Sequence, residues 1–260
     1  MANHMSENQR QFPWLTARAI AHRGLFEAGT VVEENTLASV RAAVEAGYAV
    51  EVDVRATVDD IIVVFHDEFL DRMTNGAGAV STWGFKQLRD EFKVGTSGQP
   101  MPSLPDVLDE IDRRQPLFVE IKSSRRKNPQ KLCAGVRHAF EGYGGQVAIM
   151  SFDPRVVNWF KAYMPKYPRG LVIGREFLLS MKRRVALQLW VQKCKPDFIA
   201  CDVNLLPNSF CTSWRKKGKP LLTWTVRDEK MESIAREHAD ALIFEKPAVI
   251  GTKITADING

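Results

Sequence analysis

The chain has 260 residues, enough for one large α/β domain or two small ones, and its 45% hydrophobic and 26% charged residues are typical of a globular protein. The balance of 36 Lys and Arg against 31 Asp and Glu gives a net charge of +5, which favours anionic ligands. The short basic runs lack interleaved aromatic residues and any nucleic-acid-binding motif, which argues against a nucleic-acid partner.

The N-terminus and the cysteines bear on where the protein works. Residues 1–10 are polar and lack the apolar core of a signal peptide, and within residues 1–5 the run Asn3-His4-Met5 resembles a cloning remnant. No later stretch is long enough to cross a bilayer. The scattered cysteines show no C-x-x-C pair and no metal-ligand spacing, which indicates free thiols in a reducing compartment. We therefore expect a cytoplasmic protein without stable membrane insertion, and the sequence leaves a homodimer open.

From Arg18 onwards, short β-like runs alternate with amphipathic helical stretches, as in a parallel sheet built from βα units. The runs are at 19–21, 49–54, 117–121, 147–150, 170–173, 197–200, 220–225 and 241–244. Helices are predicted at 36–47, 105–113, 130–140, 155–163, 178–194, 209–217 and 229–238. Eight strands predict one TIM (β/α)8 barrel domain at 18–260 after an N-terminal extension at 1–17. An open doubly wound sheet is the runner-up, but no G-x-G-x-x-G or Walker loop follows any strand.

The connection between the second and third strands is too long for a βα unit, so we predict a small insertion at about 58–102. Within it, the β-like run 61–65 ends at His66 and Asp67. Asp59 and Asp60 form a plausible hairpin turn that would return this run along the second strand, towards Glu51. Residues 95–100 have the composition of a loop, and we predict that they act as a lid.

Acidic residues mark the ends of the second and third strands. Alternation in 48–54 sends Glu51 and Asp53 to one face of the strand and the valines to the other. Glu120 ends the next strand, and the C-terminal ends of barrel strands carry the active site. Three such carboxylates suit Mg²⁺ or Ca²⁺. The alternative is a network without metal, in which Lys122 or Arg23 supplies the counter-charge.

Two histidines are the candidate general acid and base, because imidazole titrates near neutrality. His22 ends the first strand, and His66 ends the run in the insertion, where Asp67 could fix its tautomer. A lone histidine is more often structural, but two beside a metal site favour catalysis. His138 and His238 fall in predicted helices without neighbouring carboxylates, so we interpret both as ordinary residues.

Other residues at the strand ends suggest contacts to an anion. Arg23 follows His22 and could hold a phosphate through its planar guanidinium, while Gly24 either allows a close backbone approach or simply makes a turn. Glu34 stands before the first predicted helix, where we interpret it first as part of a cap and otherwise as support for the site. Trp224 could line the pocket, although a core tryptophan is commoner.

Seven short motifs in fixed order make the chain resemble the glycerophosphodiester phosphodiesterase family. They are His22-Arg23-Gly24, Glu34-Asn35-Thr36, Glu51-Val52-Asp53, His66-Asp67, Glu120-Ile121-Lys122, Ser151-Phe152-Asp153-Pro154 and Thr223-Trp224-Thr225-Val226. The resemblance runs from about residue 19 to residue 247. It implies a TIM barrel with a small insertion after the second strand, which agrees with the elements counted above.

The resemblance also implies a chemistry. His22 and His66 would be the acid/base pair, the three carboxylates the ligands of a divalent cation, and Arg23 and Lys122 phosphate contacts. The implied reaction cleaves a glycerophosphodiester to sn-glycerol 3-phosphate and an alcohol. The glycerol 2-hydroxyl attacks phosphorus as one histidine takes its proton, the other protonates the leaving alcohol, and water opens the cyclic phosphate. The cation neutralises charge on the phosphoryl oxygens.

Several residues depart from the family's common pattern. Glu33 replaces a frequent proline, Asp60 a glycine, Met73 a threonine, Arg227 an asparagine and Glu245 an aspartate. None is a proposed ligand or acid/base residue, so these departures concern the outer shape of the pocket and the preferred head group.

Two alternatives to a soluble glycerophosphodiester substrate stay open. A lysophospholipase D-type enzyme on the same barrel would show exposed apolar residues at the mouth, so the aromatic residues of the insertion are informative; these are Phe69, Trp83, Phe85 and Phe92. Their default role is to pack the insertion onto the barrel. A non-catalytic phosphate-binding barrel is the other alternative, and retention of both histidines and all three carboxylates argues against it.

Overall fold

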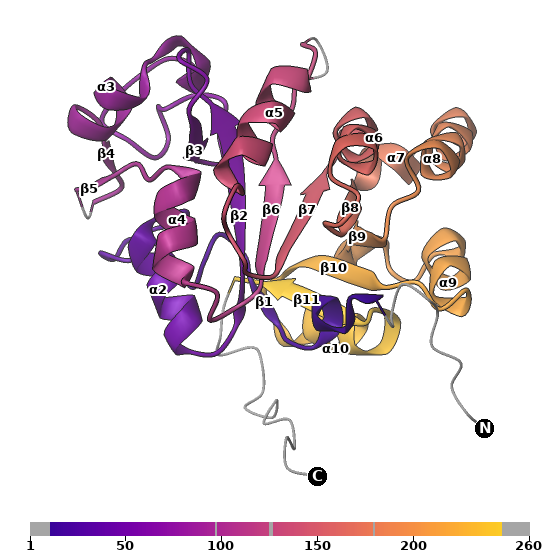
Figure 1. The fold of residues 1–260 in the computed structure, drawn as a ribbon. Helices are drawn as coiled ribbons and strands as arrows, with labels where there is room; N and C mark the ends of the chain where they lie inside the picture. Colours follow the sequence, from indigo (N-terminus) through magenta and orange to yellow (C-terminus); the bar gives the residue numbers. More distant parts are fainter. Residues whose placement is uncertain (1–10, 97, 125–126, 179, 246–260) are drawn as a thin grey trace.

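The computed structural model describes residues 11–96, 98–124, 127–178 and 180–245. Eight parallel strands form a closed barrel in the order β1-β11-β10-β9-β8-β7-β6-β2, and β1 pairs with both β2 and β11 (Figure 1). They are β1 (Ile20–Ala21), β2 (Ala49–Ala56), β6 (Leu117–Ile121), β7 (Val147–Ser151), β8 (Arg169–Ile173), β9 (Phe198–Asp202), β10 (Leu221–Val226) and β11 (Ala241–Phe244). The predicted TIM barrel is therefore confirmed.

Helices connect these strands and surround the barrel (Figure 1). They are α2 (Leu37–Glu45), α4 (Leu104–Ile111), α5 (Gln130–Ala139), α6 (Pro154–Tyr163), α7 (Arg175–Leu178), α8 (Met181–Cys194), α9 (Ser209–Lys216) and α10 (Glu229–His238). The prediction of one helix over 178–194 is wrong at its start. Ser180 accepts a hydrogen bond from the backbone N–H of Arg183, so it caps a new helix there. Within the described residues, no helix has the length and apolar character needed to span a bilayer.

The alternation predicted for the second strand decides what lies inside the barrel. Ala49 packs in the barrel interior with Phe118 and Phe198, whereas Val50 and Val52 join the core beneath the surrounding helices. Glu51 and Asp53, which share the parity of Ala49, therefore face inwards.

A 3₁₀ turn, Pro13–Thr16, closes the end of the barrel at which the strands begin. Leu15 is 1% exposed and belongs to the interior cluster, and the ring of Trp14 lies edge-on to Phe118 at 5.8 Å. This end of the barrel interior is therefore filled with apolar side chains. The polar side chains of the interior lie at the opposite end, where the C-terminal ends of the strands meet.

The insertion forms a separate lobe on β2. Its strand β3 (Ile62–Val64) pairs antiparallel with β2 through the predicted turn, in which Asp60 has φ of 61°. The lobe continues with a 3₁₀ turn (Val80–Thr82), α3 (Phe85–Asp90) and the ribbon β4 (Lys93–Val94) and β5 (Gln99–Pro100). Trp83, Phe85 and Phe92 pack in a small core of the lobe, whereas Phe69 is 55% exposed.

The stretch 95–100, predicted as a loop, includes β5 in its described part, and Ser97 lies outside the described residues. Thr96 and Gln99 donate hydrogen bonds to the backbone oxygens of Thr30 and Val31, which lie between β1 and α2. The role of this stretch as a lid stays a prediction.

Candidate active site

Three buried carboxylates meet at the mouth of the barrel. Glu51 and Asp53 come from β2 and Glu120 from β6, where Asp53 and Glu120 are register partners. Oxygen atoms of all three lie within 4.8 Å of one another. Glu51 Oε1 has no hydrogen-bond partner among the described residues, although it is buried. Because an unpaired buried carboxylate oxygen is costly, this donor set fits a hard divalent cation such as Mg²⁺ or Ca²⁺.

Two basic residues compensate part of this negative charge. Lys122 Nζ lies 2.9 Å from Asp53 Oδ1 and also contacts Glu120, while Arg23 Nε lies 3.3 Å from Asp53 Oδ2. Burial alone would raise the pKa of Asp53, but the charges of Lys122, His66 and Arg23 outweigh it and hold that pKa below its usual range.

The other two carboxylates are less well compensated. Burial, then repulsion from Asp53 and Glu120, raises the pKa of Glu51 well above its ordinary value. Burial also raises the pKa of Glu120, against the attraction of Lys122. The carboxylate–lysine–arginine network that the sequence offered as an alternative is therefore present, but the ion pairs that Lys122 and Arg23 form within the described residues are with other carboxylates than Glu51.

The His22-Arg23-Gly24 turn joins β1 to this cluster. Arg23 and Gly24 both have positive φ, 60° and 78°, and the backbone N–H of Arg23 donates to Glu51 Oε2 at 2.9 Å. A Cβ at Gly24 would lie 2.6 Å from the backbone carbon of Ser39. Gly24 is therefore needed both for the turn and for its close approach to α2.

Each candidate catalytic histidine has Nδ1 against a carboxylate. His22 Nδ1 lies 2.9 Å from Glu245 Oε1, and His66 Nδ1 lies 2.6 Å from Asp67 Oδ1. This arrangement directs Nε2 of each ring away from its orienting carboxylate; His22 Nε2 is 3.9 Å from Glu51 Oε2. Burial lowers the pKa of His66, although the charge of Asp53 opposes that effect.

Glu34 links the two sides of the site instead of capping α2. Thr36 and Ser39 form the capping box of that helix. Glu34 Oε1 accepts hydrogen bonds from Arg23 at 2.9 Å and from Arg72 at 2.7 Å. Arg72 also binds Asp67, so a chain of ion pairs runs from the β1 turn to the insertion.

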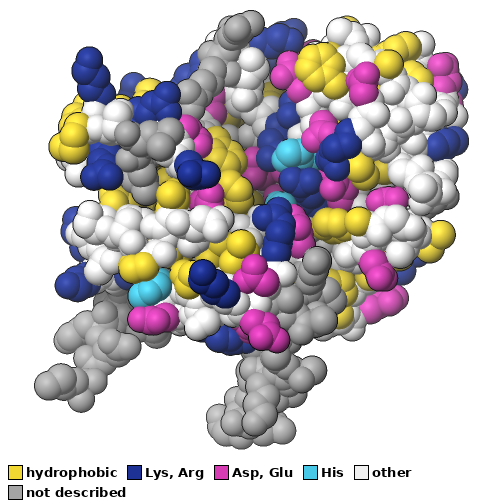
Figure 2. Space-filling view, turned by 180° about the vertical axis from the view of Figure 1, so that it is seen from behind, with side chains coloured by type: hydrophobic (Ala, Val, Ile, Leu, Met, Phe, Trp, Pro, Cys, Tyr) yellow, Lys and Arg dark blue, Asp and Glu magenta, His cyan; other side chains and the backbone are white. Residues whose placement is uncertain are grey.

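Trp224 lies in the inner layer of the barrel. Its ring is edge-on to Phe152 at 5.4 Å, and its Nε1 donates to Ala200 O at 3.1 Å. Lys122 Nζ lies 5.9 Å from the centre of the Phe152 ring. On the face shown in Figure 2, histidine side chains lie in a recess among acidic and basic side chains.

The chain matches the model of the glycerophosphoryl diester phosphodiesterase family over residues 22–249. The chain belongs to this family. It is 29% identical to a glycerophosphodiester phosphodiesterase of Caldanaerobacter subterraneus, over 89% of this chain and 95% of the relative. Its identity to glycerophosphodiester phosphodiesterase 1 of Mus musculus is 42%, over 82% of this chain and 73% of the relative.

Solved structures of glycerophosphodiester phosphodiesterases share the fold. An Oleispira antarctica phosphodiesterase in complex with the product sn-glycerol-3-phosphate has a TM-score of 0.78 and 22% identity, over 90% of this chain and 95% of that one. A Silicibacter pomeroyi protein described as a glycerophosphoryl diester phosphodiesterase has a TM-score of 0.77 and 20% identity, over 92% of this chain and 95% of that one. The predicted family is confirmed, and the chain is a phosphoric diester hydrolase rather than a non-catalytic barrel.

Sequence reasoning missed several residues of this glycerophosphodiester phosphodiesterase site. Asn35 forms two hydrogen bonds with Asp53. Its Nδ2 donates to Asp53 Oδ2 at 2.9 Å, and its Oδ1 accepts from the backbone N–H of Asp53 at 3.1 Å. Arg72 was not singled out. Glu245 and Arg227 were noted only as departures from the family pattern, yet they bind each other, and Glu245 contacts His22. Because both residues depart from the family's common pattern, their joint change was the signal in the sequence that could have indicated this contact.

Proposed function

We propose that this enzyme hydrolyses glycerophosphodiesters to sn-glycerol 3-phosphate and an alcohol, with His22 and His66 as its acid/base pair. The observation that carries the proposal is the pair of carboxylate-oriented histidines beside a buried cluster of three carboxylates. The names of the relatives and the product bound to the Oleispira antarctica neighbour support the substrate class. The free, buried cysteines are compatible with action in a reducing cytoplasm.

Glu51, Asp53 and Glu120 would hold the divalent cation, Mg²⁺ or Ca²⁺. When bound, that cation supplies positive charge to the phosphoryl oxygens. Arg23 and Lys122 can share their remaining donors with the phosphate, because a guanidinium has five N–H groups and an ammonium three. Both side chains are already fixed by ion pairs, so they offer a rigid anion site.

The histidines move the protons. Asp67 and Glu245 favour a proton on Nδ1 of each ring, which leaves Nε2 to exchange a proton with substrate. Because burial lowers the pKa of His66, its ring is neutral near neutral pH and can take the proton of the glycerol 2-hydroxyl. His22, carrying a proton on Nε2 as well as on Nδ1, would then give the Nε2 proton to the oxygen of the leaving alcohol. In the second step the neutral His22 would take a proton from the water that attacks phosphorus, and His66 would return its proton to the glycerol 2-oxygen as the cyclic phosphate opens.

A coupled assay for glycerol 3-phosphate tests this proposal. His66→Ala and His22→Ala should each lower kcat by about 10²–10⁴-fold, the usual contribution of general acid/base catalysis. His138→Ala is the matched control, because that side chain is 83% exposed on α5. Unchanged turnover in a folded His66→Ala variant would refute the assignment. Detection of a cyclic phosphate by ³¹P-NMR would support the two-step route.

The same assay tests the cation. Chelation should remove activity, and addition of Mg²⁺ or Ca²⁺ should restore it. Full activity in a demetallated sample, checked by elemental analysis, would contradict the metal role. Lysophospholipid should be included as a substrate, because Phe69 is 55% exposed three residues after His66 and could contact an acyl chain. Faster cleavage of the lysophospholipid than of any soluble glycerophosphodiester would favour the lipid-directed alternative.

A further inference from the structure

Helix α8 has apolar side chains on two opposite faces. Leu187 and Cys194 are buried against the barrel. On the outer face, Met181, Val185 and Leu189 are 71%, 49% and 60% exposed. Spacing of four residues places these three in one stripe along the helix. An exposed apolar stripe of this kind is typical of an interaction surface.

Positive charge surrounds this stripe. At 3.6 residues per turn, Lys182 and Lys193 fall on one side of it and Arg184 on the other. The sequence 177–219 contains nine Lys and Arg and only two Asp, a net charge of +7 compared with +5 for the whole chain. One of these acids, Asp197, is neutralised by Arg169 at 3.2 Å. The region around α8 and α9 is therefore the basic side of the molecule.

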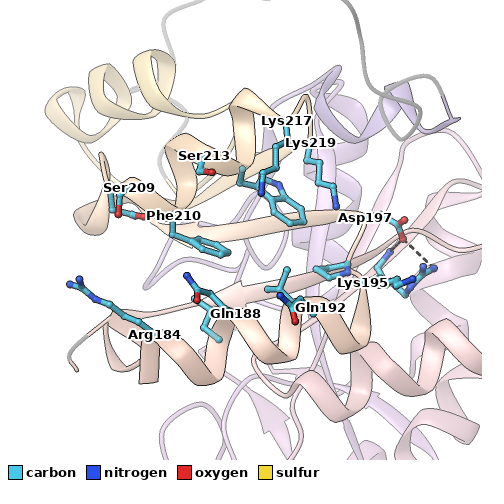
Figure 3. Close-up of a pocket in the computed structure, with 16 residues that line it drawn as sticks. Arg184, Gln188, Gln192, Lys195, Asp197, Ser209, Phe210, Ser213, Lys217 and Lys219 are labelled. Carbon is cyan, nitrogen blue, oxygen red and sulfur yellow. Dashed lines mark hydrogen bonds and ion pairs between the residues drawn. The ribbon is translucent and has the colours of Figure 1, made fainter. Parts of the chain in front are cut away.

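A groove continues the basic surface from α8 to α9. Its volume is about 1050 Å³. Arg184, Gln188 and Gln192 extend into it from α8, and Phe210 and Lys217 extend from the α9 side (Figure 3). The groove thus joins cationic groups to apolar walls directly beside the exposed stripe.

We propose that the α8 stripe and the α8–α9 groove dock on the surface of an anionic phospholipid bilayer. The stripe would enter the layer of head groups, and the flanking Lys and Arg side chains would contact lipid phosphates. Charge complementarity favours this occupant, because α8 and α9 contain no acidic residue. The stripe also starts at the end of α8 that follows β8, the mouth side of the barrel, so docking would hold the mouth near the lipid surface.

Vesicle flotation tests the proposal. The wild-type chain should float with vesicles that mix phosphatidylglycerol and phosphatidylcholine, and not with phosphatidylcholine alone. Met181→Ser/Val185→Ser/Leu189→Ser should weaken binding by more than about tenfold, since it removes the inserted apolar groups. Lys182→Gln/Lys193→Gln should weaken vesicle binding by roughly fivefold for each lysine replaced. The binding that is left should be less sensitive to salt than that of the wild type.

A matched control is Val58→Ser/Lys131→Gln, two exposed positions away from α8, which should bind vesicles like wild type. All variants should keep wild-type turnover of a soluble glycerophosphodiester, so loss of vesicle binding is separable from loss of the catalytic function. No flotation of the wild type, equal binding to neutral vesicles, or unaltered binding of the stripe variant would overturn the proposal. Conversion of a dimer to a monomer by the stripe variant, seen by light scattering, would make the face a self-interface and overturn it too.

Discussion

Glu245 illustrates how one side chain determines the state of its neighbour. Burial works against its charge, but hydrogen bonds from His22 and Arg227 outweigh burial and lower the pKa of Glu245 to about 2. The carboxylate therefore stays ionised at any working pH. A fixed anion at 2.9 Å from Nδ1 favours a proton on that nitrogen of His22, and in the proposed reaction it would leave Nε2 to exchange a proton with substrate.

We predict that Glu245→Gln lowers kcat by roughly 10–100-fold with little change in KM, because the ring of His22 loses its orienting charge. The pH profile of kcat should shift as well, which a purely structural role would not produce. Glu245→Asp should restore part of the rate, since it keeps the carboxylate. Glu237→Gln, at a side chain that is 74% exposed, is the control. Wild-type kcat in Glu245→Gln would contradict the positioning role.

At the residue scale, strand alternation was the strongest guide from the sequence. The parity of β2 and the strand ends were enough to expect Glu51, Asp53 and Glu120 together. Asn35 was quoted only as part of a motif and was given no contact with Asp53, because that bond depends on a backbone φ of +56° just before α2, which only the fold makes visible. Pairs that meet only in the folded chain, such as Glu245 and Arg227, have no local pattern.

At the scale of elements, α6 begins at a charged cap. Asp153 accepts the backbone N–H of Arg155 and is also bound by the Arg155 and Ser123 side chains. Burial opposes ionisation, but these hydrogen bonds hold the pKa of Asp153 below the usual aspartate range. Because the folded pKa is depressed, the stabilisation is complete above the pKa of unfolded Asp, about 3.9, and is lost as pH falls through the folded value.

Asp153→Ala should therefore lower the free energy of unfolding by about 1 kcal/mol at pH 7 and by progressively less below pH 4. Urea unfolding at several pH values measures both. Ser180→Ala removes a neutral cap from α8, so its cost should be the same at each pH. A cost of Asp153→Ala that does not decrease in acid would show that the ionised state of the cap is irrelevant.

Periodicity located the barrel elements better than it located those of the insertion. Every predicted barrel strand is present, because a buried parallel strand is a continuous apolar run. Elements of two to six residues, such as β4, β5 and α3, are too short for a period to emerge. The start of α8 was misplaced because the apolar residues before Ser180 continue the helical pattern without a break.

At the scale of the whole molecule, we expect the carboxylate cluster to link metal binding to stability. Three buried carboxylates repel one another, and Glu51 Oε1 has no partner among the described residues. Mg²⁺ or Ca²⁺ at about 100 times its Kd should stabilise the fold by about 2.7 kcal/mol, or roughly 5–10 °C in Tm. Glu51→Gln should melt no lower than wild type without metal and should lose most of the metal-dependent shift. Scanning calorimetry measures these Tm values. An equal metal-dependent increase in Tm for the wild type and Glu51→Gln would show that the cation binds elsewhere.

The pairing of β1 with β11 has a consequence for biosynthesis. Ile20 lies beside Ile243, so the barrel closes between β1 and β11, the first and the last strands in the described part of the chain. A ribosome delivers β11 after the other seven barrel strands, and until then β1 and β10 each have an unpaired edge. Such edges recruit other chains, so fragments that stop before residue 241 should aggregate or depend on chaperones. The barrel is protected from edge-to-edge association only when β11 has left the ribosome and paired with β1 and β10.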